Sequence, residues 1–286
     1  MGELTAQALV RQTRERLFAG GIENAAAEAR WLYEAATGRD CRLAQRSDET
    51  TTREAAQTLE ALTLRRINGE PLQYLLGEWE FYGRRFAVGR GVLIPRQDTE
   101  TLIDFARERF FGKTGAGFTV IDLCAGTGCI GLTLEKELPG AQVLLAELSP
   151  AALEYLAANA RALSSDARIL AGDVLDAEFV ARLPEADLIV SNPPYLTDAE
   201  LQTLQCEVAH EPVQALAGGA DGMDFYRRIT ALWRSKLTPG GTLAFEAGAG
   251  QAEVISQILK DNGFVNIGTR ADLCGIERVV FGETVQ

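Results

Sequence analysis

Short apolar segments alternate with helical segments from Asp98 onward, and four of the apolar segments end at or near a polar side chain. Brief runs rich in β-branched and apolar residues are typical of buried strands. Strands that alternate with helices form a mostly parallel sheet covered on both faces. The expected strands are 118–123, 142–146, 168–171, 187–191 and 240–246, with a final hairpin-like pair at 265–267 and 278–281.

Polar residues stand at or near the carboxyl ends of four of these strands: Asp122, Glu147, Asp173 and Asn192. Open α/β sheets bind their ligands at this edge. For each acid taken alone, a helix cap or a solvated loop is the simpler interpretation. The four together predict one ligand site.

A small, glycine-containing loop, Cys124–Gly128, joins the strand 118–123 to a helix expected over 130–137. Glycine between a strand and a helix allows a tight turn and a close approach of the backbone to a ligand. Asp122 precedes this loop, where it would repel a pyrophosphate and suit an ammonium group. The predicted cofactor-binding residues are Asp122, Cys124, Ala125, Gly126, Thr127, Gly128, Glu147, Asp173, Val174 and Asn192.

Two of these acids have expected partners in a nucleoside. Glu147 lies roughly 20 residues beyond the loop, where Rossmann-like sites hold a ribose diol. Asp173 is placed to accept a hydrogen bond from an adenine amino group. A nicotinamide-dependent oxidoreductase on the same kind of sheet is an alternative, but it gives no reason for the motif that follows.

The strand at 187–191 runs into Asn192-Pro193-Pro194-Tyr195. Proline fixes φ and donates no backbone hydrogen bond, so the strand ends in a stiff turn. The side-chain carbonyl of Asn192 and the backbone carbonyl of Pro193 can accept both hydrogens of one planar NH2 group, and Tyr195 can flank a flat substrate. We therefore expect these four residues to bind substrate, with Asn192, Pro193 and Tyr195 catalytic. A proline-rich strand end with a packed tyrosine is the alternative.

Charge argues against a nucleic-acid partner. Residues 1–70 are close to neutral, whereas residues 97–286 carry 14 basic and 27 acidic side chains. Affinity for nucleic acid rests largely on neutralising phosphates, which an acidic surface does poorly. A basic protein surface is an easier partner.

Five cysteines without a C-x-x-C pair indicate free thiols in a reducing compartment, with neither a disulfide framework nor zinc. No stretch approaches the roughly 20 apolar residues of a membrane helix. Residues 1–7 lack a basic region followed by an apolar core, so no secretory signal is expected. We expect a cytoplasmic protein with no metal site, and interpret the single histidine, His210, as a surface or turn residue.

The chain divides into three expected parts. Apolar residues at three- and four-residue spacings over 24–36, and a cap at Thr51-Thr52 before a helix ending near Gly69, indicate a helical domain over 1–70. The alternating stretch 79–92 indicates a hairpin within a linker, 71–96. The catalytic domain is expected over 97–286.

Taken together, the glycine loop and the acids after it resemble a class I S-adenosylmethionine methyltransferase. The Asn-Pro-Pro-Tyr form resembles enzymes that methylate planar amino groups. Five further segments extend the resemblance over nearly the whole chain and are similar to the HemK/PrmC family of release-factor glutamine methyltransferases: Gly69–Gly77, Leu93–Glu100, Glu211–Leu216, Gly222–Arg228 and Glu277–Val280.

The resemblance implies a Rossmann-like, mostly parallel seven-stranded sheet with a small N-terminal helical domain. It implies transfer of a methyl group from S-adenosyl-L-methionine, leaving S-adenosyl-L-homocysteine, to N5 of the glutamine in the Gly-Gly-Gln motif of class 1 peptide chain release factors. The helical domain and hairpin would dock that protein, with no direct nucleic-acid or membrane partner.

Two alternatives to this activity stay open at the level of sequence. A DNA or RNA adenine-N6 methyltransferase shares the Asn-Pro-Pro-Tyr motif, and a non-catalytic cofactor sensor shares the sheet. The chain also departs from the family pattern twice: Gln97 stands where proline is usual, and Cys124 stands at a loop position that is often glycine. A small cysteine should fit there if its φ is negative, so we expect cofactor binding to survive this change.

Overall fold

The computed structural model describes residues 5–46, 50–113, 115 and 117–285. The chain forms two compact units. The first, here called the helical unit, is Met1–Glu78 with Gln205–His210, and the second, the sheet unit, is Trp79–Leu204 with Glu211–Gln286. The expected boundaries of the helical docking domain (1–70), the linker (71–96) and the catalytic domain (97–286) stay predictions. We expected no secretory signal over residues 1–7. Residues 1–4 of that segment lie outside the described residues.

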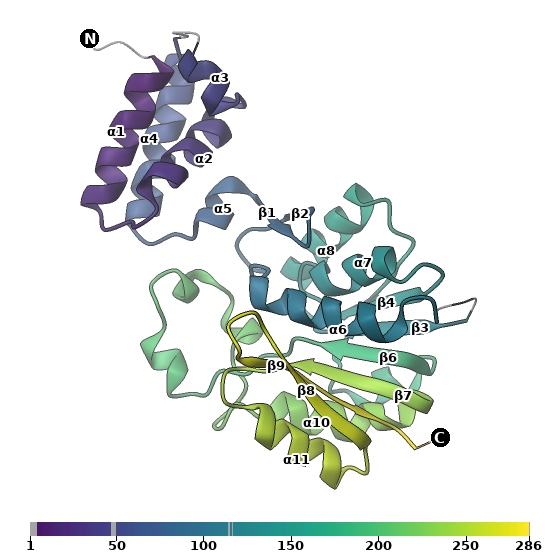
Figure 1. Cartoon of the computed structure of the whole chain (residues 1–286). Coiled ribbons are helices and arrows are strands. Elements are labelled where there is room, and N and C mark those ends of the chain that lie inside the picture. Colours follow the sequence, from purple (N-terminus) through teal and green to yellow (C-terminus); the bar gives the residue numbers. More distant parts are fainter. Residues whose placement is uncertain (1–4, 47–49, 114, 116, 286) are drawn as a thin grey trace. The chain divides into compact units, whose positions relative to one another are not determined.

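Three long helices pack together in the helical unit (Figure 1). Thr5 and Thr52 cap the first and last of them by accepting from backbone N–H groups of the first turn, and Gly38 ends the second in the left-handed conformation. Their facing sides bury an apolar stripe that includes Leu17, Leu32 and Tyr33. The elements are α1 (Ala6–Ala19), α2 (Ala25–Thr37), α3 (Cys41–Arg46), α4 (Arg53–Ile67) and α5 (Leu72–Leu76).

A buried arginine ties a distant segment to this unit. Arg66 is 5% exposed and donates to Glu28 at 2.6 Å. It also donates to Glu207 at 2.8 Å. Because a buried cation without partners is costly, Arg66 holds the segment Gln205–His210 against the helices of its own unit.

Seven strands form the main sheet of the sheet unit among the described residues, in the order β5-β4-β3-β6-β7-β9-β8. The pairs from β5 to β7 are parallel, and β9 pairs antiparallel with both β7 and β8. This confirms the expected mostly parallel, seven-stranded sheet. The strands are β3 (Thr119–Leu123), β4 (Gln142–Glu147), β5 (Arg168–Ala171), β6 (Ala186–Ser191), β7 (Leu237–Glu246), β8 (Val265–Ala271) and β9 (Glu277–Glu283).

The chain leaves β3 in one direction across the sheet and returns to start β6 on its other side. This reversal is the position at which open α/β sheets bind ligands, outside the carboxyl ends of the strands. The ends of β3 and β6 are locked together there, because the Ser191 hydroxyl donates to the Leu123 carbonyl at 2.9 Å.

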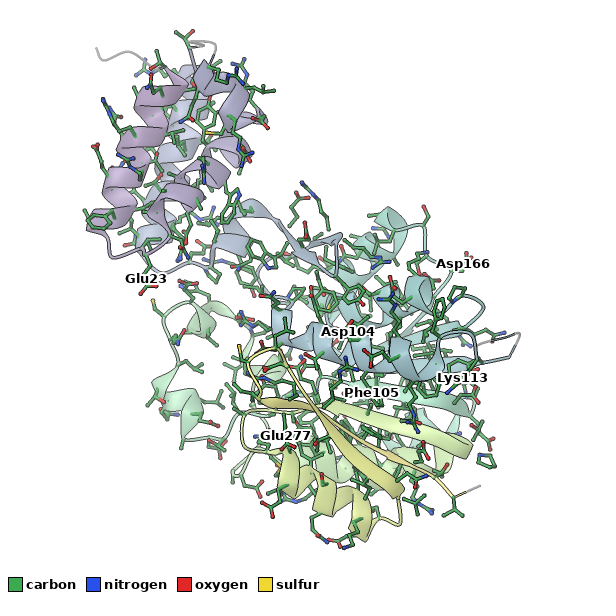
Figure 2. All side chains as sticks on the ribbon, in the orientation of Figure 1. Glu23, Asp104, Phe105, Lys113, Asp166 and Glu277 are labelled. Carbon is green, nitrogen blue, oxygen red and sulfur yellow. The ribbon has the colours of Figure 1, made fainter. Side chains whose placement is uncertain are left out.

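Helices cover both faces of the sheet (Figure 1). One layer packs on Val120, Leu145 and Val190, and the other on Ile121 and Ile189, as the two-residue alternation of a strand requires. Phe105, labelled in Figure 2, belongs to the first layer. Its ring centroid lies 4.6 Å from that of Phe281. The first layer holds α6 (Glu100–Phe110), α7 (Cys129–Glu137) and α8 (Pro150–Ala162), and the second α9 (Ala177–Ala181), α10 (Asp224–Trp233) and α11 (Ala252–Asp261).

The expected hairpin is present as β1 (Glu78–Phe81) and β2 (Arg84–Ala87), joined by Tyr82 and Gly83 with positive φ at both positions. The Tyr82 backbone N–H donates to Glu100, which ties the turn to α6. A 3-10 turn, Gln97–Thr99, leads directly into α6, so Gln97 does not interrupt the start of that helix.

Shorter elements complete the description. Further 3-10 turns lie at Glu200–Thr203, Val208–His210, Val213–Ala215 and Arg234–Lys236, and the turn position expected for His210 is confirmed. All five cysteines are free thiols. Within the described ranges, no helix is long and apolar enough to span a bilayer, and no group of three or more metal-binding side chains is present.

Candidate active site

The loop after β3 has two left-handed glycines, Gly126 at φ 56° and Gly128 at φ 80°. A Cβ on Gly128 would come within 2.4 Å of Leu156. The loop therefore requires glycine at this position for lack of space as well as for its backbone conformation. The negative φ on which the fit of Cys124 was expected to depend is not found. Its φ is 59°, in the left-handed region.

Asp122 lies beneath this loop rather than in the pocket described below. Its side chain is fully buried, and its Oδ2 accepts from the backbone N–H of Gly131 at 2.8 Å. Burial raises the pKa of this carboxyl to about 8, against the effect of that hydrogen bond. The direct contact with an ammonium group that we expected from the sequence does not fit this position. Asp122 instead fastens the start of α7 to the end of β3.

Glu147 organises the opposite side of the loop from the end of β4. One carboxylate oxygen accepts from the Gly126 N–H at 2.8 Å, and the other accepts from Leu148 at 2.8 Å and Ser149 at 2.7 Å. Glu147 is 8% exposed and borders the pocket. Each carboxylate oxygen has about two acceptor positions, so Oε2 keeps capacity for a further donor from the pocket.

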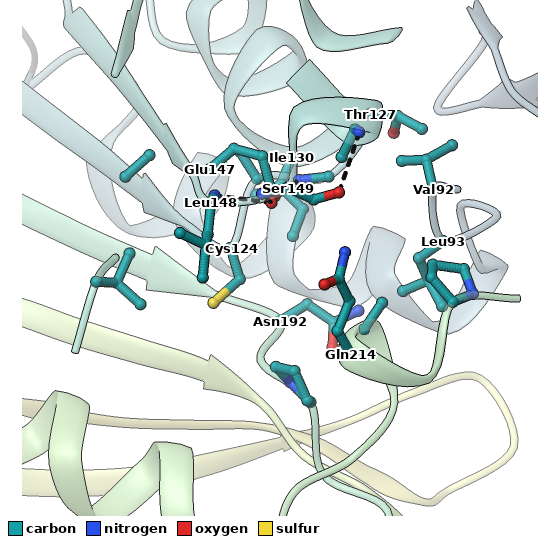
Figure 3. Close-up of a pocket in the computed structure, with 18 of the residues that line it drawn as sticks. Val92, Leu93, Cys124, Thr127, Ile130, Glu147, Leu148, Ser149, Asn192 and Gln214 are labelled. Atoms are coloured by element: carbon teal, nitrogen blue, oxygen red, sulfur yellow. Dashed lines mark hydrogen bonds between the residues drawn. The ribbon is translucent and has the colours of Figure 1, made fainter. Parts of the chain in front are cut away.

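A pocket of about 200 Å³ lies above the carboxyl ends of β3, β4, β5 and β6. Figure 3 shows Glu147, Leu148 and Ser149 along one side, with Asn192 and Gln214 on another. Apolar side chains dominate the remaining wall, and Val92, Ile130 and Phe225 are among them.

Most of the residues predicted from the sequence meet at this one pocket. The lining includes Cys124, Ala125, Gly126, Thr127, Glu147, Asp173, Val174, Asn192 and Pro194. Asp122, Gly128, Pro193 and Tyr195 are not in that lining; the last three are each next in the chain to a residue that is.

The orientation of Asn192 is set by a buried hydroxyl. Its Nδ2 donates to the Thr99 hydroxyl oxygen at 3.4 Å, and Thr99 is 1% exposed. With the amide nitrogen turned to Thr99, the carbonyl oxygen Oδ1 is the end of the side chain that is left for a ligand.

The Pro-Pro-Tyr turn is braced from behind by backbone. Leu196 and the loop that ends at Gly218 exchange hydrogen bonds, Leu196 N–H to the Leu216 carbonyl and Gly218 N–H to the Leu196 carbonyl, both at 2.8 Å. A Cβ on Gly218 would lie 2.6 Å from the Tyr195 Cα. The Gln251 side chain also donates to the Tyr195 carbonyl at 3.0 Å. The turn is therefore held rigid by contacts that leave no room for a side chain at residue 218.

Two segments that sequence reasoning could not connect form a further wall. Glu211 is buried, accepts from the Ile94 N–H at 3.1 Å and pairs with Arg96. Burial raises the pKa of Glu211, and the Arg96 guanidinium opposes that rise. This pairing places Arg96 and Pro212 at the pocket, 116 positions apart in the chain.

Several lining residues were missed as site residues: Thr99, Arg96, Leu148, Ser149, Gln214 and Phe225. Arg96, Thr99, Gln214 and Phe225 lie within the segments that carried the family resemblance. Those segments were therefore the available signal, although nothing in them assigned a role to each side chain.

Two protein-family models match separate parts of the chain. The PrmC N-terminal domain model matches residues 8–77, and the Methyltransferase small domain model matches residues 100–220. Among solved structures, a methyltransferase from Pyrococcus furiosus superposes with a TM-score of 0.54 at 16% identity, covering 72% of this chain and 91% of that one. At this identity the match shows the methyltransferase fold alone.

Closer relatives are found by sequence. A release factor glutamine methyltransferase of Geobacter sulfurreducens is 41% identical over 272 residues, covering 94% of this chain and 93% of its own. One from Cereibacter sphaeroides is 40% identical over 268 residues, covering 93% of each chain. The chain belongs to the release factor glutamine methyltransferase family.

Proposed function

We propose that this chain transfers a methyl group from S-adenosyl-L-methionine to N5 of the glutamine in the Gly-Gly-Gln motif of class 1 peptide chain release factors. The single observation that carries the proposal is the placement of Asn192 in the pocket wall with its Nδ2 turned to Thr99. That orientation offers a carbonyl oxygen to a planar NH2 group at the edge of a nucleoside-sized pocket.

The pocket fits S-adenosyl-L-methionine on three counts. Its glycine loop admits a ligand close to the backbone. Glu147 has acceptor capacity for ribose hydroxyls, and Asp173 lies at the pocket with its carboxyl fixed by the Leu175 N–H at 2.8 Å. Val174, Leu148 and Ile130 supply apolar surface for a purine ring. When bound, the cofactor supplies an electrophilic methyl group on a sulfonium.

An amide nitrogen is a poor nucleophile because its lone pair is delocalised into the carbonyl, so the protein's task is to hold it. Asn192 Oδ1 and the Pro193 carbonyl would each accept one hydrogen of the glutamine NH2 group. Both acceptors also stabilise the positive charge that develops on the nitrogen. The nitrogen would form one bond to the methyl carbon as the bond from that carbon to sulfur breaks, which leaves S-adenosyl-L-homocysteine, and would afterwards lose one proton to solvent.

Alignment is the main contribution that this rigid turn can make. Near-attack geometry is worth up to about 7–11 kcal/mol in favourable cases. The backbone brace behind Tyr195, built on Leu196, Gly218 and Gln251, keeps the two acceptors at a fixed separation. Tyr195 would pack on the amide plane of the glutamine.

A protein substrate fits the charge of the chain better than a nucleic acid does. Residues 97–286 have a net charge of −13, which disfavours a phosphate backbone. The helical unit and the hairpin are the expected docking surfaces for the release factor. We also place the protein in the cytoplasm, since all five of its cysteines are free thiols.

Mass spectrometry of a purified release factor after incubation with the protein and cofactor tests the proposal. We expect the Gly-Gly-Gln peptide to gain the net mass of one CH2 unit, since a methyl group replaces one hydrogen, and we expect no gain with the Asn192→Ala variant. An exposed-site variant on α9, Glu178→Ala, should methylate as the wild type does. Methyl transfer to DNA or RNA adenine, with none to the release factor, would establish the alternative activity instead.

A further inference from the structure

Gln214 is a polar pocket residue for which the proposed reaction has no role so far. It lines the pocket, and Figure 3 shows its side chain directed from its loop into that space. A glutamine amide carries one accepting oxygen and an NH2 group with two hydrogens. No hydrogen bond joins this side chain to another described residue. Both ends of the amide are therefore available to a ligand.

The loop that carries Gln214 is fixed at both ends. Before it, the buried Glu211 carboxylate accepts from the Ile94 N–H at 3.1 Å. After it, the Leu216 carbonyl accepts from the Leu196 N–H at 2.8 Å, and Leu196 directly follows the Asn-Pro-Pro-Tyr turn. The loop is thus bonded to the chain at the end of the turn that would hold the substrate, so the backbones of the two are set relative to each other.

The proposed complex leaves one polar group of the substrate without a partner. Asn192 Oδ1 and the Pro193 carbonyl would accept the two hydrogens of the glutamine NH2 group, but the carbonyl oxygen of that glutamine still needs a donor. A buried acceptor that loses its donor costs free energy. Arg96, a charged donor in the same lining, is already paired with a buried carboxylate. Gln214 has an NH2 group that is not engaged.

We propose that Gln214 is a substrate-specificity residue whose Nε2 donates to the carbonyl oxygen of the substrate glutamine, while Asn192 and Pro193 accept from the NH2 group of that same side chain. The inference rests on the proposed function, in which a glutamine amide occupies this pocket. The three contacts together recognise a primary carboxamide, since a lysine ammonium offers no carbonyl oxygen and a glutamate carboxylate offers no NH2 group.

This contact should strengthen substrate binding without raising the rate of methyl transfer. In the bound substrate the nitrogen lone pair is delocalised into the carbonyl, which makes the oxygen a good acceptor. As the nitrogen bonds to the methyl carbon, that delocalisation is lost and the oxygen becomes a weaker acceptor. The hydrogen bond from Gln214 is therefore at least as strong in the ground state as in the transition state. An interaction of this kind lowers KM and does not raise kcat.

The first experiment measures kcat and KM for a release factor in the wild type, Gln214→Met and Gln214→Glu. Methionine is close to glutamine in length and has neither polar group, whereas glutamate keeps the shape and replaces the donor by an acceptor. We expect KM of Gln214→Met to rise about tenfold, the loss of one hydrogen bond of about 1.4 kcal/mol, with kcat unchanged. Gln214→Glu should raise KM further, because two acceptors would then face each other.

A matched control lies on the same turn. Val213 is 61% exposed, belongs to the 3-10 turn that also holds Gln214, and is not in the pocket lining. Val213→Ala should keep the KM and kcat of the wild type. A rise in KM in this variant equal to that in Gln214→Met would assign the effect to the turn as a whole and overturn the inference.

A binding cycle tests the contact without methyl transfer. Isothermal titration in the presence of S-adenosyl-L-homocysteine measures Kd for a natural release factor and for one whose motif glutamine is replaced by methionine. Gln214→Met should weaken binding of the natural release factor about tenfold. It should leave binding of the altered one unchanged, because the carbonyl that it contacts is then absent. Equal weakening of both release factors, or of neither, would overturn the inference.

The outcomes for the reaction and for the contact are separable. A wild type that methylates no release factor refutes the proposed function, and the binding cycle still decides whether Gln214 contacts the glutamine carbonyl. A wild type that methylates the release factor, together with a Gln214→Met variant that lowers kcat and leaves KM unchanged, keeps the proposed function and overturns the role assigned to Gln214.

Discussion

Glu147 is the residue whose removal should weaken cofactor binding most clearly. Its carboxylate accepts three backbone N–H groups, from Gly126, Leu148 and Ser149, at 2.7–2.8 Å. In the proposed complex it also accepts from the ribose. Truncation to alanine therefore removes both a ligand contact and the acceptor that shapes the loop around that ligand.

The size of the effect follows from those bonds. One hydrogen bond to a charged group is worth about 1.5–3 kcal/mol, so loss of the ribose contact alone raises Kd about 10- to 150-fold. Glu147→Gln keeps one accepting oxygen, which can serve either Gly126 or the pair Leu148 and Ser149. We expect it to fall between the wild type and the alanine variant.

Isothermal titration with S-adenosyl-L-homocysteine measures these constants directly. The exposed Glu178→Ala variant controls for the loss of one negative charge from the same domain. A Glu147→Ala protein that stays folded and binds within about twofold of the wild type would refute the role assigned to Glu147, since a single charged hydrogen bond already exceeds that difference.

Three further predictions concern the substrate cradle, the glycine loop and the buried acid. Asn192→Ala should abolish turnover and leave cofactor Kd within a few-fold, as measured by labelled methyl transfer and titration; equal turnover would remove Asn192 from the mechanism. Gly128→Ala should lose about 2–4 kcal/mol of unfolding free energy, because a left-handed backbone and a clash with Leu156 add together. Gly38→Ala, left-handed but with nothing within 4 Å, should lose only the backbone part. Burial raises the pKa of Asp122 from its ordinary value of 3.8 to about 8, so the stability of the wild type relative to Asp122→Asn should fall as the pH rises between these values. The slope is at most about 1.4 kcal/mol per pH unit; urea unfolding that shows no pH-dependent difference would contradict the burial of that charge.

The sheet was predictable from sequence because each strand carries its own local pattern. The segments expected at 142–146 and 168–171 correspond to β4 and β5 within one residue. The same local reasoning predicted that Glu147, Asp173 and Asn192 lie at one edge of the sheet. The end of a parallel strand fixes the edge at which the next residue lies.

The remaining features depend on contacts between distant segments, which local patterns do not encode. Asn192 and Thr99 are 93 residues apart, so the orientation of the amide could not be derived from the motif alone. Asp122 was misplaced for a related reason. Its position at a strand end was right, but the side chain turns under the loop to the Gly131 N–H. The left-handed φ of Cys124 likewise reflects how early the chain must turn after β3.

A structure of the protein with S-adenosyl-L-homocysteine and a release factor containing the Gly-Gly-Gln motif tests the central claim most directly. The account predicts that the glutamine side-chain nitrogen lies within about 2.7–3.2 Å of both Asn192 Oδ1 and the Pro193 carbonyl oxygen. A glutamine nitrogen that contacts neither oxygen, or an Asn192 that presents Nδ2 to it, would contradict the account.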